Sequence, residues 1–410
     1  MTPRRVVITG CGLVSALGNS THQAFDRLHL TRNCVIHSPE LDTYTGLGSH
    51  LAAPATEFQR PEHYSRKVVR TMGRVSILAL NATEQALAQA QLLDTPQALQ
   101  NGRTGVAYGS SSGSVDAIAD FYTVLQSREV RNVTSSTYIK MMSQTTAVNL
   151  SVHFGTTGRL IPTSTACTSG SLAIGSAYEA IRYGLQDIMI AGGAEEFSPT
   201  QVAIFDTLFA TSHRNDEPEA TPRPFDRLRD GLVIGEGAGT VILEERERAL
   251  ARGVPILGEV LGFATNTDGR HVTQPNPATM AQAMRLALQD AGLSPADVGY
   301  INAHGTATDL GDIAEGTATA EVFGSGVPVS TIKSYTGHTL GACGAIEAIL
   351  TLEMLRGGWL APNLNLTDPD PRCGGLDFVT GEGRATEAKI GVSNNFAFGG
   401  VNTSLVLGVE

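Results

Sequence analysis

The sequence predicts an α/β protein with buried sheets, because two kinds of segment alternate along the chain. Short runs of β-branched and apolar residues indicate strands, and longer runs with apolar residues at helical spacing indicate helices. We expect strands, in chain order, in VVIT, TGVAYG, IMIAGG, TVILEE, GYINAHG, VPVSTIKS and KIGVSNN. We expect helices in VSILALNATEQALAQAQ, MAQAMRLALQDAGL and GAIEAILTLEMLRGG. Near-continuous apolar strands are typical of sheets that helices cover on both faces.

Length and composition favour a large globular protein with an extensive core. The chain has 410 residues, of which 41% are hydrophobic and 17% are charged, which suits two or three domains or one large double domain. The net charge of −11 at pH 7 argues against nucleic acid as a partner. There is no run of about 18 apolar residues, so no membrane-spanning helix is expected.

The cysteines and the first residues of the chain indicate the cellular compartment in which the protein is expected. The five cysteines are an odd number without a CxxC pair, so we expect neither a disulfide framework nor a metal site. This usage fits a reducing cytoplasm. Two arginines precede the apolar run Val6–Ile8, but that run is too short for a signal peptide, and glycines interrupt the residues after it. We therefore predict a cytoplasmic protein.

The chain divides into two halves by its charge pattern and by a weak internal repeat. The charged run EERERALARGVP ends in a turn near residues 245–255 and predicts a boundary between residues 1–250 and residues 251–410. STACTSGSLAIGSAYEAI in the first half resembles SYTGHTLGACGAIEAI in the second. Each segment places a reactive side chain before a helix of small residues, which predicts a duplicated fold.

Cys167 is the first candidate for chemistry. It lies in PTSTACTSGS, residues 162–171, between a predicted strand and a helix with Ala and Gly where another backbone could come close. Free N–H groups and the helix dipole at such a position favour a thiolate, so we expect a lowered pKa. The alternative is that this cysteine is a small buried hydrophobic residue.

Three further segments carry candidate residues, and each has a structural alternative. His304 follows a predicted strand in YINAHGTATDLGD and could instead cap a turn. Lys333 and His338 lie in STIKSYTGHTLGACGAIEA, where the lysine could be a surface residue. Residues 391–402, GVSNNFAFGGVN, contain Phe398 before a Gly pair and could form a hairpin with core aromatics.

Taken together, these segments resemble the β-ketoacyl-acyl carrier protein synthases, most closely the elongating type II class. The matching segments are RRVVITGCGLVSALG, TACTSGS, RPFDRLRDGLVIGEGAG, NAHGTATDLGD, KSYTGHTLGACGAIEA and NNFAFGGVN. The resemblance implies a thiolase fold, in which two similar α/β halves form a five-layered αβαβα core. It also implies a dimer and an acyltransferase that condenses an acyl group with malonyl carrier protein and releases CO2.

The resemblance also assigns roles to the candidate residues. Cys167 is expected to be the nucleophile that takes the acyl group, with no need of a paired base. His304 and His338 are expected to donate to the thioester oxygen during decarboxylation, and the backbone N–H groups of Cys167 and Phe398 to hold the later oxyanion. Lys333 and Glu347 are expected to order the site by charge and hydrogen bonds rather than as acid or base.

Substrate-binding residues follow from the same resemblance. Thr273, Thr306 and Thr308 match positions along the tunnel for the phosphopantetheine arm of the carrier, and Phe398 matches a gating residue. Ser112 belongs to GSSSG, which lines the acyl pocket, where fatty-acid enzymes often carry a bulky aliphatic residue. The serines predict room for a bulkier or unsaturated chain. GSSSG and GEGAG lack Walker or Rossmann spacing, so no bound nucleotide cofactor is expected.

Docking of an acidic carrier protein to this acidic chain requires a local basic face. Basic residues recur at helical spacing in YSRKVVRTMGR, and Arg131 and Arg214 match approximate docking positions. The alternative is a solvated helix face. The residues in YSRKVVRTMGR are Arg66, Lys67, Arg70 and Arg74.

Two other readings and one question of pathway stay open. A thiolase would need a second cysteine in residues 391–402 and Asn in place of His304, and the chain has neither. A non-catalytic chain-length-factor subunit would lack Cys167. The motif TSTACTSGS is intermediate in sequence between the motif of fatty-acid enzymes and that of the ketosynthase subunits of type II polyketide or aryl polyene systems. The partner could therefore be a second copy or a chain-length-factor-like paralogue.

Overall fold

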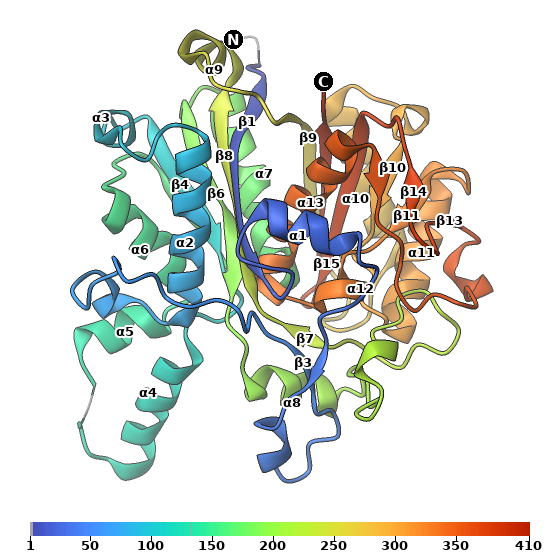
Figure 1. Ribbon diagram of the computed structural model, residues 1–410, viewed down its shortest axis with the longest axis horizontal. Coiled ribbons are helices and arrows are strands. Elements are labelled where there is room, and N and C mark those ends of the chain that lie inside the picture. The colour runs from blue at the N-terminus through green and yellow to red at the C-terminus, as the bar shows by residue number, and fades with distance from the viewer. Residues whose placement is uncertain (1–2, 132) are drawn as a thin grey trace.

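The computed structural model describes residues 3–131 and 133–410, and most of its strands join in one 11-stranded sheet (Figure 1). Each strand that the sequence predicts is found. The strands, in spatial order, are β13 (Asp377–Phe378), β11 (Pro328–Ser330), β10 (Tyr300–Asn302), β15 (Ile390–Ala397), β16 (Val401–Gly408), β9 (Gly258–Thr267), β1 (Val6–Ser15), β8 (Gly237–Glu245), β6 (Ile188–Glu195), β4 (Thr104–Gly109) and β5 (Leu160–Thr163).

The two halves of this sheet repeat one pairing pattern. From β1 outward, the pairs β1·β8 and β8·β6 are antiparallel, whereas β6·β4 and β4·β5 are parallel. From β9 outward, the pairs β9·β16 and β16·β15 are antiparallel, whereas β15·β10 and β10·β11 are parallel. A short antiparallel contact between β1 and β9 joins the halves. The duplication that the internal repeat predicted is confirmed, whereas the boundary at residue 250 stays a prediction.

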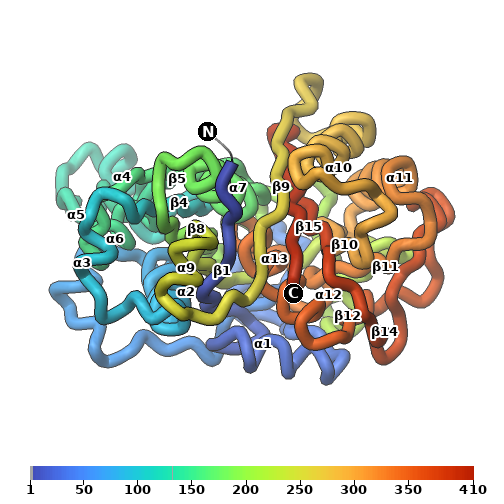
Figure 2. Tube along the Cα trace, turned by 90° about the horizontal axis from the view of Figure 1, so that it is seen from above, coloured from blue at the N-terminus to red at the C-terminus, as the bar shows by residue number. Residues whose placement is uncertain are grey.

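Helices cover the outer faces of both halves and also fill the space between them (Figures 1 and 2). Helices α2 and α6 pack on the outside of the first half, α10 and α11 lie outside the second, and α7 and α13 form the central layer. The longer helices are α1 (Thr21–Leu28), α2 (Arg74–Gln89), α4 (Val115–Ser127), α6 (Thr145–Phe154), α7 (Ser169–Arg182), α8 (Pro199–Thr207), α10 (Pro277–Ala291), α11 (Asp309–Phe323) and α13 (Cys343–Gly357).

Shorter elements connect these layers. The small strands β2 (Ile36–His37), β3 (Leu51–Ala53) and β7 (Ile234–Gly235) form a separate three-stranded sheet, and β12 (Trp359–Leu360) pairs with β14 (Arg384–Ala385). The short α-helices are α3 (Pro96–Leu99), α5 (Ser135–Met141), α9 (Arg246–Arg252) and α12 (Lys333–Thr336), and the 3₁₀ turns are η1 (Leu41–Thr43), η2 (Val68–Thr71), η3 (Ala166–Thr168), η4 (Pro218–Ala220), η5 (Pro295–Asp297), η6 (Leu340–Ala342) and η7 (Pro371–Cys373).

The segment YSRKVVRTMGR does not form the single helix that its spacing suggested. Its middle is the 3₁₀ turn η2, and α2 begins only at Arg74, after Gly73. Arg66 and Lys67 therefore precede a turn instead of lining one helix face with Arg74. No helix of the described residues is long and apolar enough to cross a membrane.

Glycines let the two central helices cross at close range, as the small residues of the sequence predicted. A Cβ at Gly170 in α7 would lie 2.9 Å from the backbone nitrogen of Ala345 in α13. A Cβ at Gly344 in α13 would lie 2.7 Å from the backbone nitrogen of Ser171 in α7. Because backbone atoms cannot swing aside as side chains do, each position excludes any side chain. This crossing brings the N-terminal turns of the two helices together.

We predict that Gly170→Ala lowers the free energy of unfolding by about 1–3 kcal/mol, the usual cost of overpacking a core. Gly326→Ala is the matched control, because an added Cβ there meets nothing within 4 Å and is expected to leave stability unchanged. Chemical denaturation of both variants measures the difference. Equal stability of Gly170→Ala and wild type would contradict the close crossing.

Candidate active site

Cys167 occupies the turn between a strand and a central helix. β5 ends at Thr163, η3 contains the cysteine, and α7 begins at Ser169, so the predicted strand-to-helix position is confirmed. Ala166, just before it, has a φ of 51°, a left-handed conformation that is strained for a residue with a Cβ. The thiol is buried, with a relative exposure of 4% for the residue.

The expectation of a lowered Cys167 pKa is wrong for this resting site. Burial raises the pKa of the thiol to about 11, and this effect outweighs the lowering by Lys333 and by the backbone N–H groups of Phe398 and Cys167. Glu195 adds a smaller raising contribution. The helix start therefore supplies donors around the sulfur, but desolvation decides the protonation state, and the resting group is a neutral thiol.

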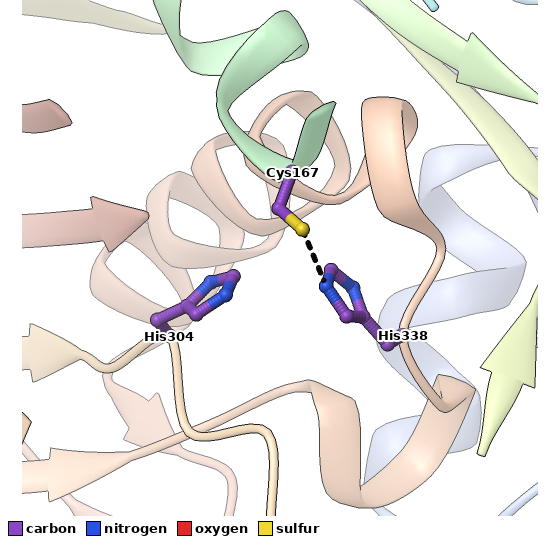
Figure 3. A group of neighbouring side chains, drawn as sticks. All are labelled: Cys167, His304 and His338. Atoms are coloured by element: carbon purple, nitrogen blue, oxygen red, sulfur yellow. Dashed lines mark hydrogen bonds between the residues drawn. The ribbon is translucent and has the colours of Figure 1, made fainter. Parts of the chain in front are cut away.

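His338 contacts Cys167 directly. Its Nε2 lies 3.0 Å from Cys167 Sγ, and its Nδ1 accepts the backbone N–H of Leu340 at 3.2 Å (Figure 3). Burial first and the charge of Lys333 second hold the pKa of His338 well below 6.5, so the ring is neutral at pH 7. With Nδ1 acting as acceptor, the single ring proton belongs on Nε2, which makes His338 a donor toward the sulfur.

His304 has the same tautomer for a parallel reason. Its Nδ1 lies 3.1 Å from Nζ of Lys333, which can only donate. Burial, Lys333 and His338, in that order, hold the pKa of His304 well below 6.5. The proton of the neutral ring is therefore on Nε2. The two rings lie 5.2 Å apart at 86° to each other, on either side of the space below Cys167 (Figure 3).

Lys333 is buried at the centre of a charged network. Its Nζ donates to Glu347 Oε1 at 2.5 Å, and both side chains are only 2% exposed. Burial by itself would lower the pKa of Lys333, but Cys343, Glu347 and Glu315 raise it overall, so the group is an ammonium at neutral pH. Asn395 donates to the other oxygen of Glu347 at 2.7 Å. The predicted contact between Lys333 and Glu347 is present.

Two residues of the site were missed by the sequence analysis. Glu315 of α11 accepts the backbone N–H groups of His304 and Gly305 at 2.7 Å each, and burial raises its pKa to about 8. Asn395 of β15 lies beside Glu347. A motif-by-motif reading passes over both, because Glu315 looks like a helix residue and Asn395 like a strand residue. Only the fold brings Glu315 and Asn395 next to His304.

A cavity of about 390 Å³ opens in front of Cys167 and both histidines. Thr273, Thr306 and Thr308 line it, as predicted, with Phe398 at its wall. The hydroxyls of Thr306 and Thr308 lie 2.9 Å apart. Ser112 is not among the lining residues, and its hydroxyl is buried without a hydrogen-bond partner in the described part of the chain. Within this one chain, the acyl-pocket prediction for Ser112 is therefore not met.

Phe398 lies at the turn of the β15–β16 hairpin, so the hairpin that was left as an alternative is also present. Its side chain is 36% exposed and stacks on Phe205 with ring centroids 5.0 Å apart. Gly399 and Gly400 follow with φ of 89° and 71°, conformations that only glycine adopts easily. A half-exposed ring before two glycines is suited to movement at the cavity wall.

The basic residues predicted for docking fall into two groups. Arg74 pairs with Glu236 and Arg214 with Glu217 and Asp230, so their charges are neutralised within the chain. Arg131 pairs with exposed Glu129. The other three are exposed and have no acidic partner in the described residues: Arg66, Lys67 and Arg70.

The duplicated topology with a buried cysteine and two imidazoles at the crossing of its central helices defines a thiolase-fold protein. Family models match in two parts: the β-ketoacyl synthase N-terminal domain over residues 3–249 and the C-terminal domain over residues 257–367. The 3-oxoacyl-[acyl-carrier-protein] synthase 2 of Vibrio harveyi is 38% identical over 417 residues, or 99% of each chain. The chain belongs to the β-ketoacyl synthase family.

Two solved structures extend this comparison. A β-ketoacyl synthase from Burkholderia phymatum STM815 is 54% identical and has a TM-score of 0.97, covering 99% of this chain and 100% of that one. The ishigamide ketosynthase/chain length factor is 30% identical and has a TM-score of 0.90, covering 100% of both chains. The fold class predicted from sequence is thus confirmed.

We predict that alkylation of Cys167 by iodoacetamide accelerates with pH and shows no plateau near about pH 8, where ordinary thiols ionise. Below a pKa of about 11 the thiolate fraction rises about tenfold per pH unit. Lys333→Met is expected to slow the reaction further, because the ammonium lowers the thiol pKa. Intact mass spectrometry against time measures both rates. A plateau around neutral pH would show that the sulfur is already ionised.

Proposed function

We propose that this protein is a β-ketoacyl-acyl carrier protein synthase that condenses a Cys167-bound acyl group with malonyl carrier protein. The observation that carries the proposal is the pair of neutral imidazoles with Nε2–H groups beside Cys167 Sγ. Two fixed donors in a buried cavity suit a reaction in which negative charge develops on one oxygen. The 3-oxoacyl-[acyl-carrier-protein] synthase relatives support the same reaction.

The first step is thioester exchange. The sulfur of Cys167 attacks the carbonyl carbon of an acyl thioester, and the bond to the phosphopantetheine sulfur breaks. The proton of the cysteine leaves with that sulfur, so one thiol and one thioester are exchanged for another pair. His338 donates to Cys167 in its resting tautomer, so it stabilises developing charge instead of removing the proton. The buried Lys333 ammonium favours the transient thiolate.

The second step is decarboxylation of the malonyl thioester. Loss of CO2 leaves an electron pair that becomes an enolate, with its charge on the thioester oxygen. The Nε2–H groups of His304 and His338 are suited to donate to this oxygen, because their pKa values keep both rings neutral and their outer nitrogens are occupied. The ammonium of Lys333 donates to Nδ1 of His304, on the side of the ring opposite the donating Nε2–H group. The cavity removes competing water from the carbanion.

The third step forms the carbon–carbon bond. The enolate carbon attacks the carbonyl of acyl-Cys167, and the negative charge moves to that carbonyl oxygen. Backbone N–H groups of Cys167 and Phe398, which already lower the pKa of the thiol, are suited to hold the oxyanion. Collapse of this intermediate expels the Cys167 thiolate, which takes a proton from solvent. The product is a β-ketoacyl thioester on the carrier.

The carrier arm is proposed to enter along the threonine wall of the cavity. Thr306 and Thr308 are half-buried and their hydroxyls face each other, whereas Thr273 is exposed. A phosphopantetheine arm carries amides and hydroxyls that such side chains can bind. No cofactor is proposed beyond this carrier-borne arm.

The partner of this chain is proposed to dock beside β5, which lies at one end of the sheet. Large apolar residues are exposed on β5 itself and on α4 and α5, which pack against each other, and such exposure is uncommon for a free surface. The ishigamide ketosynthase/chain length factor supports a paired assembly with a second copy or a paralogue. The buried hydroxyl of Ser112 has no hydrogen-bond partner among residues 3–131 and 133–410, and Ser112 is proposed to serve an acyl pocket completed by that partner. The exposed apolar residues are Ile118, Tyr122, Leu125, Tyr138 and Leu160.

We predict that carriers bearing saturated, polyunsaturated or aryl-polyenoyl chains add their acyl mass to wild type but not to Cys167→Ala. Malonyl carrier protein is then expected to discharge the adduct with release of CO2. Intact mass spectrometry reports the adduct and identifies the accepted chains. Each experiment is run with the protein alone and with a co-expressed paralogue. No adduct under either condition would contradict the catalytic proposal and favour a non-catalytic partner role.

We predict that the double substitution Lys67→Glu and Arg70→Glu raises KM for carrier-borne substrates. The exposed positive charges of the wild-type residues attract the acidic carrier, and the introduced carboxylates would repel it. Iodoacetamide, a small neutral reagent, is expected to alkylate Cys167 in this variant at the wild-type rate. Arg131→Glu is the comparison, since Glu129 already pairs with that arginine and a smaller effect is expected. Equal loss with both reagents would indicate misfolding.

A further inference from the structure

A second cluster of potential ligands lies outside the active site, on the segment that joins β2 to β3. His37 ends β2, Asp42 lies in η1, and His50 precedes β3. His37 Nε2 lies 2.9 and 3.0 Å from the two oxygens of Asp42, and His50 Nδ1 lies 2.5 Å from Oδ1. One ligand atom from each of these residues lies within 4.8 Å of the others.

The outer nitrogens of both rings are held by the backbone. His37 Nδ1 lies 3.3 Å from the carbonyl oxygen of Asn215, and His50 Nε2 lies 3.0 Å from the carbonyl oxygen of Leu47. A carbonyl can only accept, so each outer nitrogen must carry the proton. In a neutral ring the inner nitrogen is then a bare lone pair. Both inner nitrogens face the carboxylate of Asp42.

A metal ion placed between these groups would contact both inner nitrogens and the carboxylate at once, because one ligand atom of each residue lies within 4.8 Å of the others. Histidines that bind metals usually hold their other nitrogen against a backbone carbonyl or a carboxylate, as both rings do here. We propose that His37, Asp42 and His50 form a binding site for a divalent transition metal of the zinc class. Cysteine spacing in the sequence predicted no metal site, and this cluster contains no cysteine.

The donor set and exposure suit such an ion. Two imidazoles and one carboxylate are ligands that zinc accepts, with bonds of about 2.0–2.2 Å and ligand atoms therefore ~3.3 Å apart. The separations of 2.5–2.9 Å from Asp42 need to widen by less than about 1 Å, which partly exposed side chains allow. The side chains of His37, Asp42 and His50 are 41%, 46% and 26% exposed, so water can reach the fourth coordination position of a bound ion.

Hydrogen bonds from neighbouring residues hold the backbone around this cluster in place. Asn215 also accepts the backbone N–H of His50 and donates to the carbonyl of Gly48. The backbone N–H of Ser38 donates to the carbonyl of His50. The His–Asp pair of His22 and Asp26 on α1 has a single histidine and is more exposed, so it is a natural control of the same chemistry.

An ion bound by His37, Asp42 and His50 would stabilise the segment between β2 and β3, which packs against the core around Cys167. Leu41, next to Asp42, is fully buried in the same hydrophobic cluster as Cys167 and Phe205. Binding to the folded protein alone stabilises it by mass action. We therefore expect Zn²⁺ to raise the melting temperature of the folded chain.

The test is binding of Zn²⁺ to full-length protein whose Cys167 has been alkylated, measured by competition with a chromophoric chelator at neutral pH. We expect one equivalent in wild type and in His22→Ala, and a loss of affinity on the order of 100-fold in His37→Ala, Asp42→Asn and His50→Ala. Co²⁺ in the same protein is expected to show d–d bands without a thiolate charge-transfer band. The melting shift with Zn²⁺ is expected in wild type and not in His50→Ala.

Three results would overturn the proposal. They are no retained Zn²⁺ in wild type, retention that survives loss of both histidines, or a thiolate band with Co²⁺. The first would mean that hydrogen bonds between the two rings and Asp42, and no metal, hold this cluster together. Melting curves without metal show whether each variant is folded, and Asp42→Asn keeps the shape of the side chain it replaces.

Discussion

The buried ion pair between Lys333 and Glu347 is the interaction on which the rest of the site depends. An ammonium removed from water is stable only if hydrogen bonds and opposite charge replace its hydration. Glu347 supplies the charge, and His304 supplies an acceptor at 3.1 Å. The same ammonium therefore orients the histidine, adds to the effect of burial that keeps it neutral, and favours the thiolate of Cys167. Lys333 thus lowers the pKa values of Cys167, His304 and His338, although burial has the larger effect on each of them.

This network is possible because the two halves of the fold meet through small residues. Cys167 lies in the turn just before the central helix of the first half, and Glu347 lies in the first turns of the central helix of the second. Gly170 and Gly344 let these helices cross nearly backbone to backbone. A larger residue at either position would separate Cys167 from Lys333 and Glu347. The duplicated topology therefore matters for chemistry as well as for stability.

Buried carboxylates surround the site in a way that local sequence does not reveal. Glu315 holds the backbone of the His304 loop, and Glu195 accepts the backbone N–H groups of Ser111 and Gly341. Burial raises the pKa values of these groups to about 8 and about 7. Each carboxylate replaces water for backbone groups that no strand or helix satisfies. The loops that carry His304 and His338 are thereby held in place through their backbones.

The sequence by itself determined the alternation of strands and helices, the duplication, and the position of Cys167 between β5 and α7. Those features depend on residues close together in the chain, where periodicity and turn chemistry decide the outcome. Only the tertiary structure decided the protonation of Cys167, the pairing of Arg74 with Glu236, and the roles of Glu315 and Asn395. Desolvation and ion pairing depend on neighbours that are distant in sequence, and no local pattern encodes them.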